Sequence, residues 1–303
     1  MGLSRSLPSG GGSASLICSL FLFSLTTAHS VDVPSSARSR SVIARVAPKL
    51  NQEFAQKNLN WGSPIFIRII KESKELELWA KSGKKFELFR NCRIHFYSGT
   101  LGPRLREGDR QAPEGFYYVP GWRMNPRSRF HLPFDLGYPN TYDRQHRRTG
   151  SLLMVHGSTV SIGCFAMTEA RIEEIHTLAD AALNGGQSFF RVHSFPFRMT
   201  SQNMLRHYGS KWNSFWRNLK QGYDFFERSK NPPNVEVKNR SYVFESAIDR
   251  LGAVARSRNP DWAASCVRST GIAGRTGVSP IWPKSLHPHH LHPLQCHPDD
   301  GCS

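Results

Sequence analysis

The chain contains 303 residues, 39% of them hydrophobic, and carries a formal net charge of +17 at pH 7. That length allows one sizeable hydrophobic core with an extension at each end. The charge favours an acidic partner, but the lysines and arginines are spread along the chain, and no zinc-finger or RNP-type signature accompanies them. Both facts argue against nucleic acid as the partner. A carboxylate-rich polymer and a generally solvated basic surface are the two explanations left open.

The first 30 residues have the pattern of a secretory signal peptide. Arg5 precedes an apolar run over residues 15–25, and Ala28 and Ser30 supply the small residues that a signal peptidase recognises. The run is short for a membrane span, and an uncleaved inner-membrane anchor is the alternative. Export places the protein in an oxidising compartment, where paired cysteines form disulfides.

Strand patterns dominate the middle of the chain. Residues 31–60 are expected to form a polar linker followed by a short amphipathic helix over residues 46–59. Beyond it, β-branched runs and period-two alternation predict a mainly β domain with flanking helices. Strands are expected over residues 65–70, 76–80, 86–88, 93–97, 116–119, 152–156 and 189–193, with a hairpin turn at residues 81–84.

Two helical patterns follow. Thr168 is expected to cap a helix that ends at the glycines 185–186. Aromatic residues at helical spacing over residues 212–226 predict a helix that packs on the sheet as part of the core, within an extension over residues 201–247. Residues 248–303 are a low-complexity tail in which histidines alternate with prolines. That spacing fixes no coordination geometry, so a disordered tail is favoured over a zinc or copper site, and no metal site is predicted elsewhere.

A histidine and a cysteine eight residues apart carry the strongest functional signal. His156 ends a predicted strand, and Cys164 lies just before a predicted helix. A nearby imidazole and a helix N-terminus both favour the thiolate, which is the nucleophilic form of cysteine. Gly157 and Gly163 allow the backbone to turn sharply there. Within the body of the chain the other cysteine is Cys92, and a Cys92–Cys164 disulfide is the alternative to a reactive thiol.

Residues 61–200 resemble the YkuD-type L,D-transpeptidase catalytic domain, and within it the YafK-like branch of Gram-negative bacteria. The segments that carry the resemblance are residues 98–103, 108–117, 136–140, 154–157, 160–168 and 189–200. The resemblance implies two packed β-sheets with a helix after Cys164, and a periplasmic location. One departure is Ile162, which stands where most of the wider family has a second histidine; the YafK-like branch shares this form.

The resemblance also implies the chemistry. Cys164 is expected to attack the meso-diaminopimelate carbonyl of a peptidoglycan stem tetrapeptide and expel D-alanine, and His156 to move the proton. No cofactor is implied. If the acyl group of the thioester is transferred to an amine, the protein is an L,D-transpeptidase. If it is transferred to water, the protein is a hydrolase that releases an outer-membrane lipoprotein from the wall. A non-catalytic protein that binds the wall is the third alternative.

Supporting roles are expected for further residues near the motif. A backbone carbonyl at Gly157 or Ser158 is expected to orient the imidazole, and N–H groups near Gly163 and Cys164 to form the oxyanion hole. Ser161 either holds the turn through a local hydrogen bond or touches substrate. Two arginines are candidates for binding substrate carboxylates, with a solvated surface role as the alternative: Arg110 and Arg148.

Overall fold

The computed structural model describes residue 2 and residues 33–159 and 161–245. The expected signal peptide and the expected tail over residues 248–303 lie outside the described residues and stay predictions. Within the described part, no helix is both long and apolar enough to cross a lipid bilayer.

The first element is the helix α1 (Ala37–Gln56), which starts earlier than the predicted residue 46 and occupies most of the expected linker. Ser36 caps it: its hydroxyl accepts the N–H of Ser39, whose own hydroxyl accepts the N–H of Ser36. Reciprocal capping of this kind satisfies two backbone N–H groups at the start of a helix. The serines that suggested a linker in this stretch therefore begin a helix instead.

A five-stranded sheet forms the centre of the domain. Its order is β3-β2-β1-β9-β5, and β1 pairs in parallel with β9 whereas the other pairs are antiparallel. Its strands are β1 (Ile65–Ile70), β2 (Glu75–Ser82), β3 (Lys85–Arg93), β5 (Gly115–Pro120) and β9 (Phe189–Phe195). The predicted strands of this sheet and the hairpin turn between β2 and β3 are confirmed. The single strand expected over residues 93–97 is wrong, because β3 ends at Arg93 and a separate short strand covers Phe96–Tyr97. Every residue of β1 is buried, because both faces of this sheet are covered.

A smaller, four-stranded sheet packs on one face of the first. It has the order β4-β8-β7-β6, built from β4 (Phe96–Tyr97), β6 (Phe134–Asp135), β7 (Met154–Gly157) and β8 (Phe165–Met167). The strand expected over residues 152–156 begins only at Met154. Leu152 has φ 54° and is 67% exposed, so the chain turns there instead of continuing as a buried strand.

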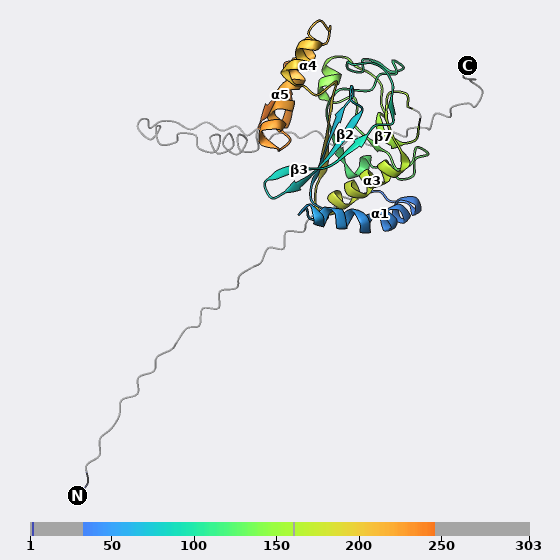
Figure 1. Ribbon diagram of the computed structural model, residues 1–303, viewed down its shortest axis with the longest axis vertical. Helices are drawn as coiled ribbons and strands as arrows, with labels where there is room; N and C mark the ends of the chain where they lie inside the picture. Colours follow the sequence, from blue (N-terminus) through green and yellow to red (C-terminus); the bar gives the residue numbers. More distant parts are fainter. Residues whose placement is uncertain (1, 3–32, 160, 246–303) are drawn as a thin grey trace, which may run out of the picture. The chain divides into compact units, whose positions relative to one another are not determined.

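The helix α3 (Glu169–Asn184) follows β8 and, with α1, packs with the two sheets around one hydrophobic core (Figure 1). It has the predicted bounds, but the Thr168 side chain makes no capping hydrogen bond. Along the chain, a 3-10 turn over Gly121–Arg123 follows β5, and the short helix α2 (Thr141–Gln145) follows β6. The fold is therefore mainly β with flanking helices, as the sequence predicts.

The extension over residues 201–245 covers the other face of the large sheet. It contains α4 (Ser201–Arg206) and α5 (Asn213–Ser229), and the aromatic face of α5 packs on Ile70, Phe116 and Phe195, which confirms its predicted core role. The extension is not purely helical as expected, because it ends in a hairpin of β10 (Asn234–Lys238) and β11 (Ser241–Glu245). Asn239 and Arg240 have φ of 49° and 60°, the turn geometry that suits a two-residue hairpin loop.

Candidate active site

Strand alternation places His156 and Cys164 on the same face of the small sheet. Val155 and Phe165 are register partners in the parallel pair β7–β8, and both belong to the buried core. Because successive side chains on a strand point to opposite faces, the residues next to them point away from that core. His156 follows Val155 and Cys164 precedes Phe165, so the imidazole and the thiol leave the sheet on one side.

The sulfur of Cys164 contacts two backbone groups at the start of β7. The N–H of Met154 donates to Sγ over 3.3 Å, and the thiol donates to the carbonyl of Leu152 over 3.7 Å. Burial raises the pKa of the Cys164 thiol, while the Met154 N–H and the nearby Arg104 oppose that rise. At neutral pH the resting group is therefore the neutral thiol. The Met154 N–H and the Arg104 charge both stabilise the thiolate that forms from it.

His156 is oriented by its own strand. The residue is 2% exposed, and Nδ1 lies 2.9 Å from the carbonyl of Gly157, which can only accept, so Nδ1 carries the proton. Burial lowers the pKa of His156, and the Gly157 carbonyl partly offsets this. Nε2 has no hydrogen-bond partner within the described residues and is the free basic nitrogen. No hydrogen bond joins Nε2 to Cys164 Sγ in the part of the chain that the structure describes, and unliganded active sites often show such a gap.

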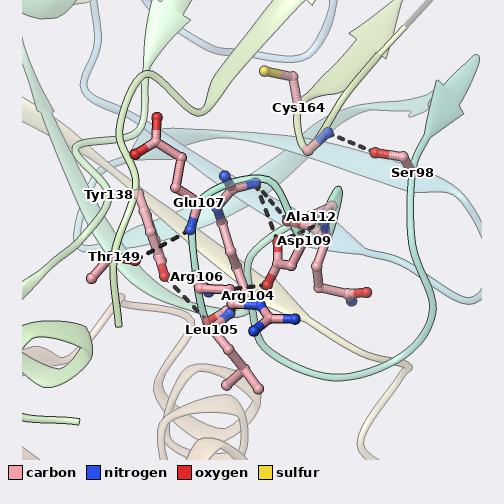
Figure 2. Close-up of polar contacts among 12 residues, drawn as sticks. Ser98, Arg104, Leu105, Arg106, Glu107, Asp109, Ala112, Tyr138, Thr149 and Cys164 are labelled. Carbon is pink, nitrogen blue, oxygen red and sulfur yellow. Dashed lines mark hydrogen bonds and ion pairs between the residues drawn. The ribbon is translucent and has the colours of Figure 1, made fainter. Parts of the chain in front are cut away.

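The turn before the nucleophile is held from two sides. Gly163 has φ +92°, which glycine adopts without strain, and its N–H donates to Ser98 Oγ over 2.6 Å (Figure 2). Ser161 Oγ donates to the carbonyl of Cys164 over 2.6 Å, so Ser161 holds the turn. Ser98 accepts the Gly163 N–H in this arrangement, and the oxyanion role expected of that N–H stays a prediction.

Arg104 lies directly behind this turn, in the loop shown in Figure 2. The residue is 5% exposed, and its Nη1 lies 3.4 Å from the carbonyl of Gln111 and 3.5 Å from Asp109 Oδ1. A Cβ on Gly163 would lie 2.5 Å from that Nη1, so the guanidinium packs against the residue before the nucleophile. Arg104 therefore supplies a positive charge close to Cys164, a contribution that the sequence did not reveal.

A buried ion pair fixes the loop that carries Ser98 and Arg104. Lys71 and Glu114 are both 0% exposed, and Lys71 Nζ lies 2.9 Å from Glu114 Oε1. The Glu114 carboxylate also accepts the indole N–H of Trp216 in α5 over 2.8 Å. Lys71 Nζ also lies within 3.0 Å of three loop carbonyls, those of Thr100, Gly102 and Ala112, so its three N–H donors are shared among four acceptors. Such pairs are stable only when fully hydrogen-bonded, as this one is.

Gly157 and Ser158 shape the backbone beyond the histidine. The N–H of Gly157 donates to the carbonyl of His131, and a Cβ on Gly157 would lie 2.8 Å from the side chain of Ile172. The N–H of Ser158 donates to the carbonyl of Met167 on the neighbouring strand. Of the two carbonyls expected to orient His156, the structure places that of Gly157 against the imidazole.

Among known proteins, the "Putative L,D-transpeptidase YafK" of Escherichia coli strain K12 is 45% identical over 199 residues, which are 66% of this chain and 80% of that protein. The protein of the same description from Escherichia coli O157:H7 matches equally. The chain belongs to the YafK-like L,D-transpeptidase family. No family model matches it.

Solved structures similar to this YafK-like chain include the helical cell shape determining protein Pgp2 from Campylobacter jejuni. It is 16% identical with a TM-score of 0.37, and the match covers 59% of this chain and 74% of that one. Bdellovibrio bacteriovorus Bd1075 is 17% identical with a TM-score of 0.32, over 58% of this chain and 78% of that one.

In this YafK-like chain, the two arginines proposed as carboxylate binders differ in their surroundings. Arg148 is 7% exposed, and its Nη1 pairs with Asp143 Oδ1 at 2.7 Å beneath the rings of Tyr142 and Phe215. Its proposed role is corrected, because the guanidinium is buried in the protein's own ion pair. Arg110 is exposed on the loop before Gln111, and its role stays a prediction.

The two cysteines of the described part are both free. Cys92 is buried in the core, where burial raises its pKa to about 11, so it is an inert thiol. Cys164 is half-buried and is flanked by two exposed apolar side chains, Leu152 at 67% and Ile162 at 73% exposure. This chain thus has one accessible thiol among its described residues.

Proposed function

We propose that the protein is a peptidoglycan L,D-transpeptidase that works through a thioester on Cys164. The observation that carries the proposal is the shared face of Cys164 and His156, where the sulfur has a backbone donor at 3.3 Å and Nε2 is unpartnered within the described residues. Membership of the YafK-like family supports the reaction class.

The first step of the proposed reaction is acylation. The sulfur attacks the meso-diaminopimelate carbonyl of a stem tetrapeptide, and the thiol proton passes to Nε2 of His156. Burial keeps the thiol and the imidazole neutral at rest, so the proton moves as the substrate arrives. The carbon–nitrogen bond to D-alanine then breaks, and the proton returns to the leaving amine. The N–H of Cys164, at the end of this turn, is the proposed oxyanion donor.

The second step decides the class of product. An amine acceptor attacking the thioester regenerates the thiol and forms a new cross-link, whereas water releases a shortened stem peptide. The proposal places the protein in the periplasm, where its substrate lies, and cell fractionation with an antibody against residues 61–200 tests this location. A cytoplasmic pool at steady state contradicts it.

Incubation with purified sacculi tests the proposed reaction. The wild type is expected to consume tetrapeptide stems and yield either new cross-links or tripeptide stems, identified by mass spectrometry of muropeptides. Cys164→Ala is expected to yield neither, while Cys92→Ala, the buried thiol control, keeps the activity if it folds. Wild-type protein that binds sacculi without changing any muropeptide would instead establish the wall-binding alternative.

A further inference from the structure

A cavity of about 360 Å³ lies where the hairpin β10–β11 meets β5 and the start of α2. Its wall includes Tyr118, Asn140 and Glu236, and it includes two guanidinium groups, those of Arg123 and Arg144. Neither arginine belongs to the nucleophile turn or to the loop behind it. Two cations on one small cavity repel each other, and the carboxylate on its wall, that of Glu236, pairs with Lys238.

The Arg123 guanidinium has donors to spare. The Arg123 side chain makes no hydrogen bond or ion pair within the described residues, and its Nε is a buried atom without a partner. The nearest acid, Asp135, turns Oδ1 to the N–H of Gly137 at 2.9 Å. A Cβ on Gly137 would lie 1.1 Å from Arg123 Nη1, so the guanidinium lies across a position that only glycine leaves open. A buried donor left unpaired is costly, so the Nε–H of this half-buried side chain calls for an acceptor.

The other polar groups around the cavity already have partners. The Asn140 amide donates to the carbonyl of Phe116 and to the hydroxyl of Tyr242, both over 2.9 Å. Tyr118 donates to the carbonyl of Val235, and Glu236 pairs with Lys238 at 3.1 Å. Arg144 donates to the carbonyl of Pro139 and to Thr141. The unused hydrogen-bonding capacity is therefore that of Arg123, a planar fork that fits a carboxylate through two parallel bonds.

Arg123 links this cavity to the segment beside the nucleophile, because its guanidinium packs on Gly137, two residues after Asp135. Asp135 pairs in register with Met154, whose N–H donates to Cys164 Sγ over 3.3 Å. Phe134 and Phe165 point into the core, so Asp135 and Cys164 both point to the other face.

We infer that this cavity binds a carboxylate of the acyl-donor peptide, held by Arg123 with Arg144 beside it. This inference rests on the proposed function. A murein stem peptide carries several carboxylates, and one of them would bind here. The enzyme is therefore expected to prefer the unmodified peptide over one amidated at that carboxylate.

Calorimetric titration of a synthetic stem tetrapeptide into full-length Cys164→Ala protein tests the inference. Arg123→Gln is expected to weaken binding by about tenfold or more, since hydrogen bonds to charged groups contribute about 1.5–3 kcal/mol. Peptides amidated at one carboxylate at a time should show the same loss of affinity for only one of the amidated positions. For that peptide, Arg123→Gln should weaken binding little further. Arg144→Gln, at an exposed position, is expected to weaken binding less, and Arg217→Gln on α5 not at all. Thermal unfolding checks that each variant is folded.

Unchanged affinity in folded Arg123→Gln overturns the inference, as does equal loss for every amidated peptide or the absence of any tetrapeptide binding. Acylation of wild-type Cys164 by a carbapenem is measured in parallel. If the adduct forms while Arg123→Gln binds peptide normally, the inference fails and the proposed function stands. If neither adduct nor peptide binding is seen, both fail.

Discussion

The backbone N–H of Met154 points at the sulfur of Cys164 over 3.3 Å, while the carbonyl of Leu152 accepts from the same thiol over 3.7 Å. Leu152 has φ 54°, and this turn lets two residues of one segment present both a donor and an acceptor to the sulfur. The acceptor suits the neutral thiol and the donor suits the thiolate. The strand start thus accommodates the group before and after it loses its proton.

Removing the Arg104 charge should make Cys164 harder to ionise. Arg104 opposes the burial that raises the pKa of Cys164, so Arg104→Gln is expected to raise that pKa further and slow thiol alkylation at pH 7. The rate of iodoacetamide labelling of the Cys164 peptide, followed by mass spectrometry from pH 6 to 10, measures the shift. Arg106→Gln, an exposed arginine of the same loop, is the control. A profile unchanged or moved to lower pH in Arg104→Gln contradicts the assignment.

Removing the imidazole should slow acylation. His156→Ala is expected to lower kcat/KM by roughly a hundredfold or more, the usual contribution of a general base. His95→Ala, at an exposed position, should leave the rate unchanged. Burial lowers the pKa of His156, so the imidazole stays neutral at pH values below the ordinary histidine pKa of about 6.5. The acid limb of the wild-type profile of kcat/KM against pH should therefore lie below about pH 6.5. An acid limb above that value would show that another group supplies the base.

Ser98 should affect rate through the geometry of the turn. Ser98→Ala removes the acceptor for the Gly163 N–H, a neutral hydrogen bond contributing about 1 kcal/mol, so kcat/KM is expected to fall roughly fivefold. Ser188→Ala, exposed and remote from the turn, is the matched control. Faster acylation in Ser98→Ala would mean that the freed Gly163 N–H serves as an oxyanion donor after all.

Acid should destabilise the protein through its buried histidines. His176 is 0% exposed, and burial lowers its pKa to about 4, so the unfolded chain binds a proton that the folded chain excludes. The contribution of neutral His176 to the free energy of unfolding is complete above about pH 6.5. About 3 kcal/mol of that free energy is lost as the pH falls to 4. Urea unfolding at pH 7 and pH 4.5 should show a smaller loss in His176→Gln than in the wild type or in exposed-site His95→Gln. An equal loss in all three proteins contradicts this origin.

Local pattern predicted most of the scaffold. The alternation on both sides of Gly83 indicated the β2–β3 hairpin, and the aromatic spacing in α5 indicated its buried face. The misplaced start of α1 and the missed hairpin at Asn239 have local causes. Serines that suit a loop also cap a helix, and the turn lacks the glycine that usually marks such a loop.

The site was predictable only where its residues are close in sequence. His156 and Cys164 share a motif, and their placement on one face follows from strand alternation. Arg104 and Ser98 reach the nucleophile from a loop about 60 residues away, which no local period encodes. Arg148 misled for a different reason: its partner Asp143 lies only five residues away, but the sequence alone does not show that the pair is buried.

The most direct test of the account is the intact mass of the full-length protein after incubation with a carbapenem, a thiol-reactive mimic of the acyl donor. The account predicts one covalent adduct per chain, mapped by peptide digestion to Cys164, absent from Cys164→Ala and slowed in His156→Ala. An unmodified wild type, or an adduct of equal yield on Cys164→Ala, would contradict the central claim that this sulfur is the nucleophile.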